Sequence, residues 1–161
     1  MKNNENDGII QINAEDDFEK PKWEICNDEF VIETVKDLIE KYHRPRCNLS
    51  HDMFGFLWAL KGLPGGSSGV CCKVGDKFKP FFKKPVLFVI IIDFEQWNIL
   101  EKNQKIALLD HELCHAYAYE DRKGRLKTKL IDHDIEEFNC IVNRHGLWHD
   151  GLENFYNSVK K

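Results

Sequence analysis

Residues 86–93 read Val-Leu-Phe-Val-Ile-Ile-Ile-Asp, in which seven apolar residues, rich in β-branched side chains, precede the aspartate. Such a run predicts a strand in the middle of a sheet, where both of its faces are buried. It is much shorter than the roughly 20 apolar residues that a membrane-spanning helix needs. We therefore expect a globular fold built around this strand, with no membrane span.

The rest of the chain carries further helical and extended patterns. Apolar spacing and flanking cap or turn residues predict a helix over 28–42, a strand or short helix over 53–60, a turn over 62–69, a strand over 70–74, and helices over 100–120, 134–144 and 152–159. A short sheet packed on a central helix, with additional helices around it, places the chain in the α+β class.

The composition fits a single folded domain. The chain has 161 residues, of which 42% are hydrophobic, and its net charge is -4. Residues 1–20 are polar and acidic, so we expect a disordered tail followed by one domain over 21–161. That tail lacks the apolar core of a signal peptide, which predicts a cytoplasmic protein. The small net charge does not by itself indicate a nucleic-acid or membrane partner.

Six cysteines stand at positions 26, 47, 71, 72, 114 and 140. None of them forms a C-x2-C pair, which is the usual spacing of a structural zinc site. In a reducing compartment this scatter predicts reduced thiols rather than disulfides or a zinc ribbon.

Residues 110–115 read Asp-His-Glu-Leu-Cys-His and lie within the predicted helix 100–120. Positions four apart share a helix face, so His111 and His115 can offer two imidazoles to one metal ion. Glu112 borders that face and is placed to accept a proton from water that the metal activates. Zinc suits such a set because it binds nitrogen and oxygen ligands tetrahedrally and has no redox chemistry. The motif therefore predicts a zinc hydrolase with Glu112 as its catalytic base.

The helix is expected to separate a core side from a functional side. The core side holds Ile106, Leu109, Leu113 and Ala116 at helical spacing. The functional side holds Leu108, His111, Glu112, His115 and Tyr119. Asp110 and Asp132 are candidates to orient the imidazoles by hydrogen bonds.

A catalytic zinc needs a third protein ligand, and the candidates lie after the helix. They are His133, Glu136, Glu137, His145 and His149. His133 is favoured over the two glutamates on spacing and ligand type, because the loop around Gly124 lets the chain fold back over the first helix. A site with two histidines and one glutamate stays an alternative.

HELCHA over 111–116, followed by HDIEEF over 133–138, resembles the SprT-like metallopeptidases, in which HExCHA precedes a histidine that opens a helix. The two segments resemble more closely the phage-type zinc metallopeptidases, which add an ending such as Arg-His-Gly-Leu-Trp, here 144–148. The resemblance is specific over 104–148. The chain lacks the C-terminal zinc ribbon of many SprT-like proteins and has Asp134 where they usually have glycine, which favours the phage-type group.

The resemblance implies a zinc metallopeptidase acting on a protein or peptide. It implies that His111, His115 and His133 bind Zn²⁺ and that Glu112 is the catalytic base. The implied fold is zincin-like, with a short sheet packed against the HExxH helix.

Two basic groups suggest a different class of function. One comprises Arg122, Lys123, Arg125, Lys127 and Lys129, and the other comprises Lys73, Lys77, Lys79, Lys83 and Lys84 among Phe78, Phe81 and Phe82. Interleaved charges and aromatic rings could hold single-stranded nucleic acid, although such runs ordinarily form a solvated face. The rival prediction is a nucleic-acid- or protein-binding module in which the motif holds a structural metal. The sequence gives no oligomeric state.

Overall fold

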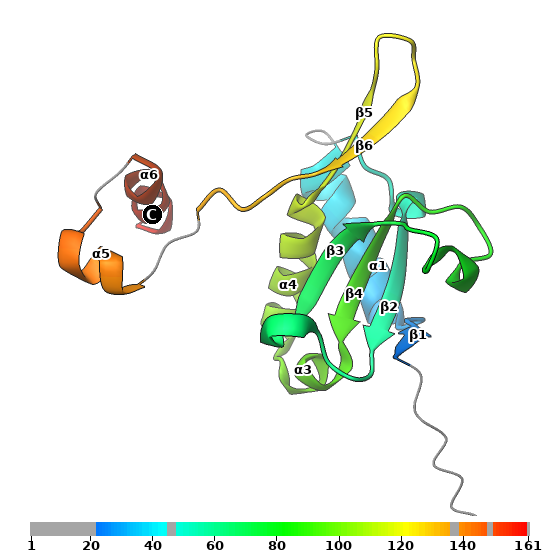
Figure 1. Ribbon diagram of the computed structural model, residues 1–161, viewed down its shortest axis with the longest axis horizontal. Helices are drawn as coiled ribbons and strands as arrows, with labels where there is room; N and C mark the ends of the chain where they lie inside the picture. The colour runs from blue at the N-terminus through cyan, green and yellow to red at the C-terminus, as the bar shows by residue number, and fades with distance from the viewer. Residues whose placement is uncertain (1–21, 45–47, 136–138, 148–149, 161) are drawn as a thin grey trace, which may run out of the picture.

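The computed structural model describes residues 22–44, 48–135, 139–147 and 150–160. Its centre is a four-stranded sheet with the order β1-β2-β4-β3 (Figure 1). The strands are β1 (Trp23–Ile25), β2 (Phe54–Ala59), β3 (Gly69–Lys73) and β4 (Phe88–Asp93). β2 and β4 run parallel, β1 pairs antiparallel with β2, and β3 pairs antiparallel with β4. The α+β class and the strands predicted over 70–74 and 86–93 are confirmed. The segment 53–60 forms a strand, the first of its two predicted alternatives, and β1 is an addition.

β4 lies between β2 and β3, and all of its residues are buried. Its side chains alternate between two cores. Phe88, Ile90 and Ile92 belong to the core on the helical face of the sheet. Val89 and Ile91 belong to a smaller core on the opposite face. Burial on both faces explains why this strand is apolar at every position up to Asp93.

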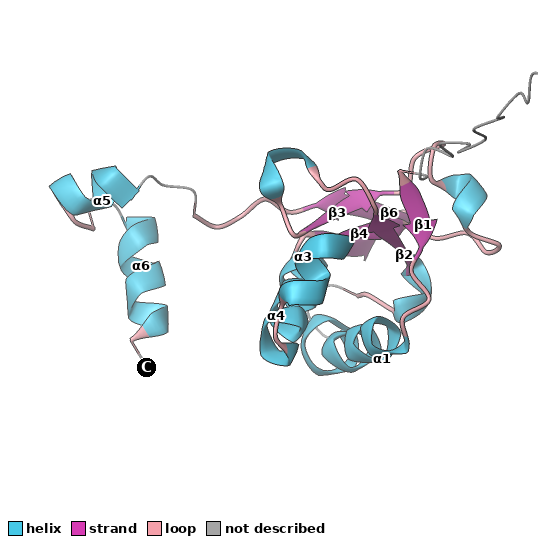
Figure 2. Ribbon diagram, turned by 90° about the horizontal axis from the view of Figure 1, so that it is seen from below, coloured by secondary structure: helices cyan, strands magenta, loops and turns pink. Residues whose placement is uncertain are grey.

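Three helices cover one face of the sheet (Figure 2): α1 (Glu29–Leu38), α3 (Phe94–Ile99) and α4 (Lys102–Cys114). Asp28 caps α1, since its Oδ1 accepts hydrogen bonds from the N–H groups of Phe30 at 2.8 Å and Val31 at 3.3 Å. A turn of π-helix over Ile39–His43 continues α1 and contacts α4.

The predicted helix 100–120 is wrong in its second half. The chain leaves α4 for a hairpin of two antiparallel strands, β5 (Ala116–Glu120) and β6 (Leu126–Leu130). Along β5, Ala116 and Ala118 are buried whereas Tyr119 is exposed, and this period of two belongs to a strand. Gly124 forms the turn with a φ of 71°, a conformation that costs glycine little.

The helix predicted over 134–144 begins later than expected. Residues 134–135 are not helical, and α5 spans Asn139–His145. The intervening residues 136–138, which include two of the candidate ligands, lie outside the described part of the chain.

A last helix, α6 (Asp150–Val159), confirms the amphipathic segment predicted over 152–159. Figures 1 and 2 both show α5 and α6 away from the sheet. The tail predicted over 1–20 lies outside the described residues. Among the residues that are described, no helix is long and apolar enough to cross a membrane.

Candidate metal centre

The structure brings three of the predicted metal ligands together. The Nε2 atoms of His111 and His115 are 3.3 Å apart, and those of His111 and His133 are 3.1 Å apart. The three imidazoles form a group that could hold a metal ion. Among the other candidate third ligands, His145 lies on α5 and is not part of this group, and the remaining three fall outside the described residues.

The β5–β6 hairpin carries His133 back to α4. The N–H of Ile131 donates to the carbonyl of His115 at 2.8 Å, which closes the base of the hairpin. The Nδ1 atom of His115 lies 2.6 Å from the carbonyl oxygen of Ile131. A carbonyl only accepts, so Nδ1 must carry the proton and donate it. The Nε2 atom of His115 then presents a bare lone pair to the other two rings.

The spacing of the three nitrogens fits a tetrahedral zinc ion. Each Zn–N bond is about 2.0–2.1 Å long, so two nitrogens on one zinc lie about 3.3–3.4 Å apart. The observed separations, 3.3 Å and 3.1 Å, are close to this value. Burial lowers the pKa of His111, and the neighbouring His115 and His133 lower it further. A lowered pKa favours the neutral imidazole, which is the form that binds a metal.

Glu112 lines a cavity together with the three histidines, and its side chain is buried. Its exposed fraction is 3%, and the adjacent buried residues of the helix are Leu109 and Leu113. Burial raises the pKa of the Glu112 carboxyl, while the nearby His115 and a hydrogen bond from the Cys71 backbone act in the opposite direction. The sequence offers no sign of this burial, because it arises from the approach of β3.

β3 is an edge strand whose free side faces this carboxyl. The carbonyl of Ser68 accepts from the N–H of Asp93 on β4, at 3.0 Å, so the backbone groups of Gly69 and Cys71 point the other way. A Cβ added at Gly69 would lie 2.9 Å from Oε1 of Glu112. Glycine at this position therefore lets the strand approach the carboxyl, a role that the predicted flexible turn over 62–69 did not suggest.

Two cavities adjoin the three histidines. The first, of about 320 Å³, lies between the start of β3 and the end of the hairpin, and it is lined by Glu112 as well as the histidines. The second, of about 470 Å³, extends from the histidines past Tyr117 and the segment 131–135 as far as Phe155 of α6. The candidate ligands thus lie at the junction of two open spaces that a substrate could occupy.

Asp110 does not orient a metal-ligating imidazole as predicted. Its Oδ1 lies 2.6 Å from Nε2 of the buried His43, which belongs to the continuation of α1. His43, Asp110 and Cys114 form a second group of potential metal ligands. However, 2.6 Å is a hydrogen-bond length and is too short for two ligands of one zinc ion. The pair therefore links α1 to α4.

His43 was not foreseen as part of this region, although it follows Ile39 at the spacing of a buried helical stripe. Asp132, the other predicted orienting residue, lines both cavities. The group that holds His115 is the Ile131 carbonyl, and no side-chain pattern could reveal a backbone contact of this kind.

One family model covers most of the chain. Residues 22–160 match the sequence model of a family described as "Putative phage metallopeptidase", and the match includes all four motif residues. Neither the curated proteins nor the solved structures gave a match. Membership of this family implies a bound metal ion and a protein or peptide substrate, whereas the resemblance to SprT-like proteins stays a prediction. The chain belongs to the phage metallopeptidase family.

Proposed function

We propose that this protein is a zinc metallopeptidase of the HExxH type. His111, His115 and His133 hold the zinc ion, and Glu112 is the general base. The observation that carries the proposal is the convergence of three imidazole nitrogens beside a buried carboxyl that lines the same cavity. His115 is already fixed in the tautomer that a metal requires.

When bound, zinc acts as a Lewis acid that acidifies water and polarises a carbonyl group. Glu112 accepts a proton from the attacking water and later passes it to the leaving amine. The raised pKa of Glu112 suits this exchange, because a base whose pKa lies nearer to neutrality also returns its proton more readily. The Cys71 backbone and the absence of a side chain at Gly69 fix the position of the carboxyl.

The edge of β3 supports a peptide as the substrate. Backbone groups of Gly69 and Cys71 point toward the cavity that contains the histidines, and an extended peptide binds readily beside an open strand edge. Two cavities adjoin the three histidines, so an extended chain could continue beyond the metal site in either of two directions.

The test combines metal content with hydrolysis. Zinc per chain is measured by elemental analysis for the wild type, His133→Ala and Glu112→Gln, and each protein is assayed on a fluorescently labelled unfolded protein. We expect about one zinc per chain in the wild type and in Glu112→Gln, less zinc in His133→Ala, and hydrolysis by the wild type alone. Retained hydrolysis in Glu112→Gln would refute the role of the base.

Two rival assignments are separated by the same proteins. A wild type that binds no zinc even after its addition would favour the binding module over the enzyme. Glu137→Ala serves as the matched variant for the third ligand, since loss of zinc there, with zinc retained in His133→Ala, would establish a site of two histidines and a glutamate.

A further inference from the structure

The β5–β6 hairpin connects the second proposed zinc ligand to the third. β5 begins directly after His115, and β6 ends three residues before His133. In the register of the hairpin, Tyr117 pairs with Lys129 and Tyr119 pairs with Lys127. Residues paired across two strands share one face. These four side chains, which we call the Tyr–Lys face, therefore lie on the same side of the hairpin.

The Tyr–Lys face is the more exposed side of β5, although the partly buried Tyr117 also packs against the main core. The opposite side of β5 carries Ala116 and Ala118, which are buried in the main core. Tyr117 lines the larger cavity together with the histidines, and Tyr119 further along is 41% exposed. The two rings lie 6.0 Å apart, and Nζ of Lys129 lies 4.7 Å from the centre of the Tyr117 ring. The face thus runs outward from the metal site as a continuous surface of rings and ammonium groups.

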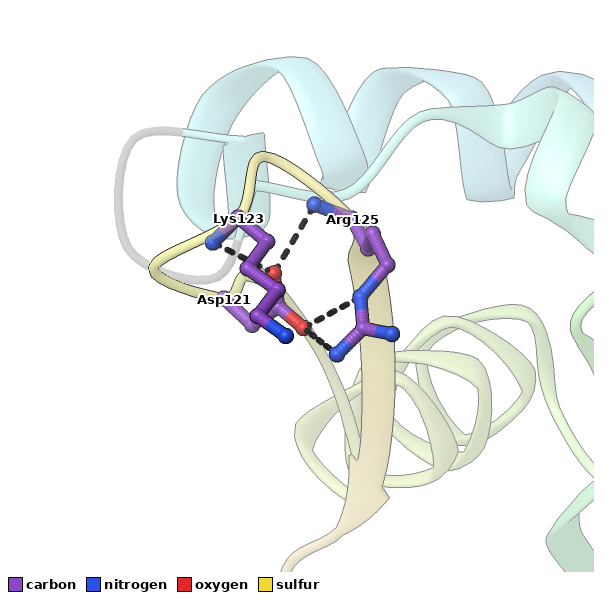
Figure 3. Close-up of polar contacts among 3 residues, drawn as sticks. All are labelled: Asp121, Lys123 and Arg125. Carbon is purple, nitrogen blue, oxygen red and sulfur yellow. Dashed lines mark hydrogen bonds and ion pairs between the residues drawn. The ribbon is translucent and has the colours of Figure 1, made fainter.

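At the turn of the hairpin, the side chain of Arg125 pairs with that of Asp121 (Figure 3). Both Nε and Nη2 of Arg125 contact Oδ2 of Asp121, at 2.8 Å and 2.7 Å. The Arg125 guanidinium accordingly holds the pKa of Asp121 below its usual value. Within the described residues, Lys127 and Lys129 have no carboxylate at ion-pair distance. The two lysines of the Tyr–Lys face therefore keep their positive charge uncompensated beside the larger cavity.

We propose that the Tyr–Lys face is a subsite for an acidic segment of the peptide substrate, next to the bond that is cleaved. This inference rests on the proposed peptidase function. In an extended chain, side chains on the same side repeat every 6.6–6.8 Å or so, which is also the repeat between Lys127 and Lys129 on β6. Two acidic residues separated by one position can therefore meet the two lysines, and the tyrosine rings pack against the aliphatic parts of the peptide.

A nucleic acid fits the same surface less well. Non-specific DNA binding depends on several phosphate contacts, commonly about six or more. Here the chain has a net charge of -4 and Arg125 is paired with Asp121. In the second basic group, Nζ of Lys73 donates to the carbonyl of Thr128 on β6, and Lys79 pairs with Asp76. The Tyr–Lys face itself offers two ammonium groups, which are enough for a peptide and few for a polyphosphate backbone.

The test is a charge swap between enzyme and substrate. Cleavable peptides of one sequence carry Glu, Gln or Lys at two alternate positions on either side of the cleaved bond, and kcat/KM is measured for each. We expect the wild type to prefer the Glu peptide over the Gln peptide by about threefold to tenfold, the range that two exposed ion pairs supply. Lys127→Glu/Lys129→Glu should reverse the order and favour the Lys peptide.

Lys83→Glu/Lys84→Glu is the matched control, because it makes the same change of charge at two exposed lysines of the loop before β4. It should keep the preference of the wild type. Lys127→Gln/Lys129→Gln, which only removes the charges, should abolish the preference, and it keeps the test valid if the reversed variant does not fold. Equal rates for all three peptides in the wild type would overturn the subsite while leaving the peptidase intact.

Binding to Glu112→Gln separates the subsite from catalysis. The anisotropy of a fluorescent Glu peptide should rise with this variant and fall when Lys127→Glu/Lys129→Glu is added, whether or not the wild type cleaves anything. Displacement of the peptide by a single-stranded oligonucleotide, with a steep dependence on salt, would overturn the proposal and identify the face as a nucleic-acid surface.

Discussion

Gly69 and Glu112 lie so close together that no side chain fits between them. A Cβ added at Gly69 would be 2.9 Å from Oε1 of Glu112 and 3.2 Å from Cδ1 of Leu108. Both contacts come from α4, whereas Gly69 begins the edge strand β3. The position of the proposed base is therefore set jointly by the helix that carries it and by the strand beside it.

Gly69→Ala should reduce hydrolysis without removing zinc. The added methyl group must displace the Glu112 carboxyl, and a displacement of this order at a catalytic group lowers kcat by about 10- to 100-fold. Zinc content and peptide hydrolysis measured on one preparation check this. Gly75→Ala is the matched control, because a Cβ at Gly75 meets nothing within 4 Å. Full activity in Gly69→Ala would show that the strand does not position the base.

Glu112→Gln should stabilise the metal-free protein at neutral pH. Burial raises the pKa of Glu112 in the folded state, so its ionisation favours unfolding. This penalty is present above the folded-state pKa and disappears below the unfolded value of about 4.3, where the carboxyl is protonated in both states. This penalty is measured as the difference in the free energy of unfolding between the variant and the wild type, in urea with a chelator, at pH 7.5 and at pH 4. The variant should gain free energy of unfolding at pH 7.5 alone, and an equal gain at both pH values would assign it to packing.

The sequence was sufficient for the central strand and for the placement of His111 and His115 on one helix, because each depends on a short local pattern. A run of β-branched residues predicts a buried strand. Histidines four positions apart, such as His111 and His115, lie on the same face of a helix. The place of His133 depended on the return of the chain over α4, and the sequence left Glu136, Glu137, His145 and His149 open as alternatives. The strand pattern and the histidine spacing can both be recognised without knowledge of the rest of the fold.

The segment 116–130 could not be predicted in the same way. Alanine has the highest helix propensity, so Ala-Tyr-Ala-Tyr-Glu continues a helix as readily as it forms a strand. The choice depends on cross-strand pairs such as Tyr117 with Lys129, which the local sequence does not contain. The burial of Glu112 likewise depends on β3, which is separated from it by about 40 residues of chain.

Asp110→Ala should destabilise the fold while zinc stays bound. The Asp110 carboxylate is 2.6 Å from Nε2 of His43, whose side chain is only 5% exposed. Without it the buried imidazole loses its partner, and an unsatisfied buried polar group costs about 1–3 kcal/mol. Thermal or urea unfolding measures the loss.

Glu40→Ala is the control for this variant, since it breaks the exposed pair between Glu40 and Arg44 in the same continuation of α1. Such exposed pairs contribute about 0–1 kcal/mol. If the two variants lost the same small amount, the contact between His43 and Asp110 would not be a stabilising link. If Asp110→Ala lost its zinc, the link would be needed to position His111.

Thiol labelling of the native protein should distinguish Cys114 from Cys26. Burial raises the pKa of Cys26 to about 11, so at pH 8 only about 0.1% of it is the reactive thiolate. Cys114 is exposed and lines the larger cavity beside the histidines. Iodoacetamide at pH 8 should therefore modify Cys114 much faster, as followed by mass spectrometry of the two peptides, and both should react in urea. A bound peptide should slow the reaction of Cys114 but not that of Cys26. If Cys26 and Cys114 reacted at equal rates in the native protein, the core around Cys26 would open readily.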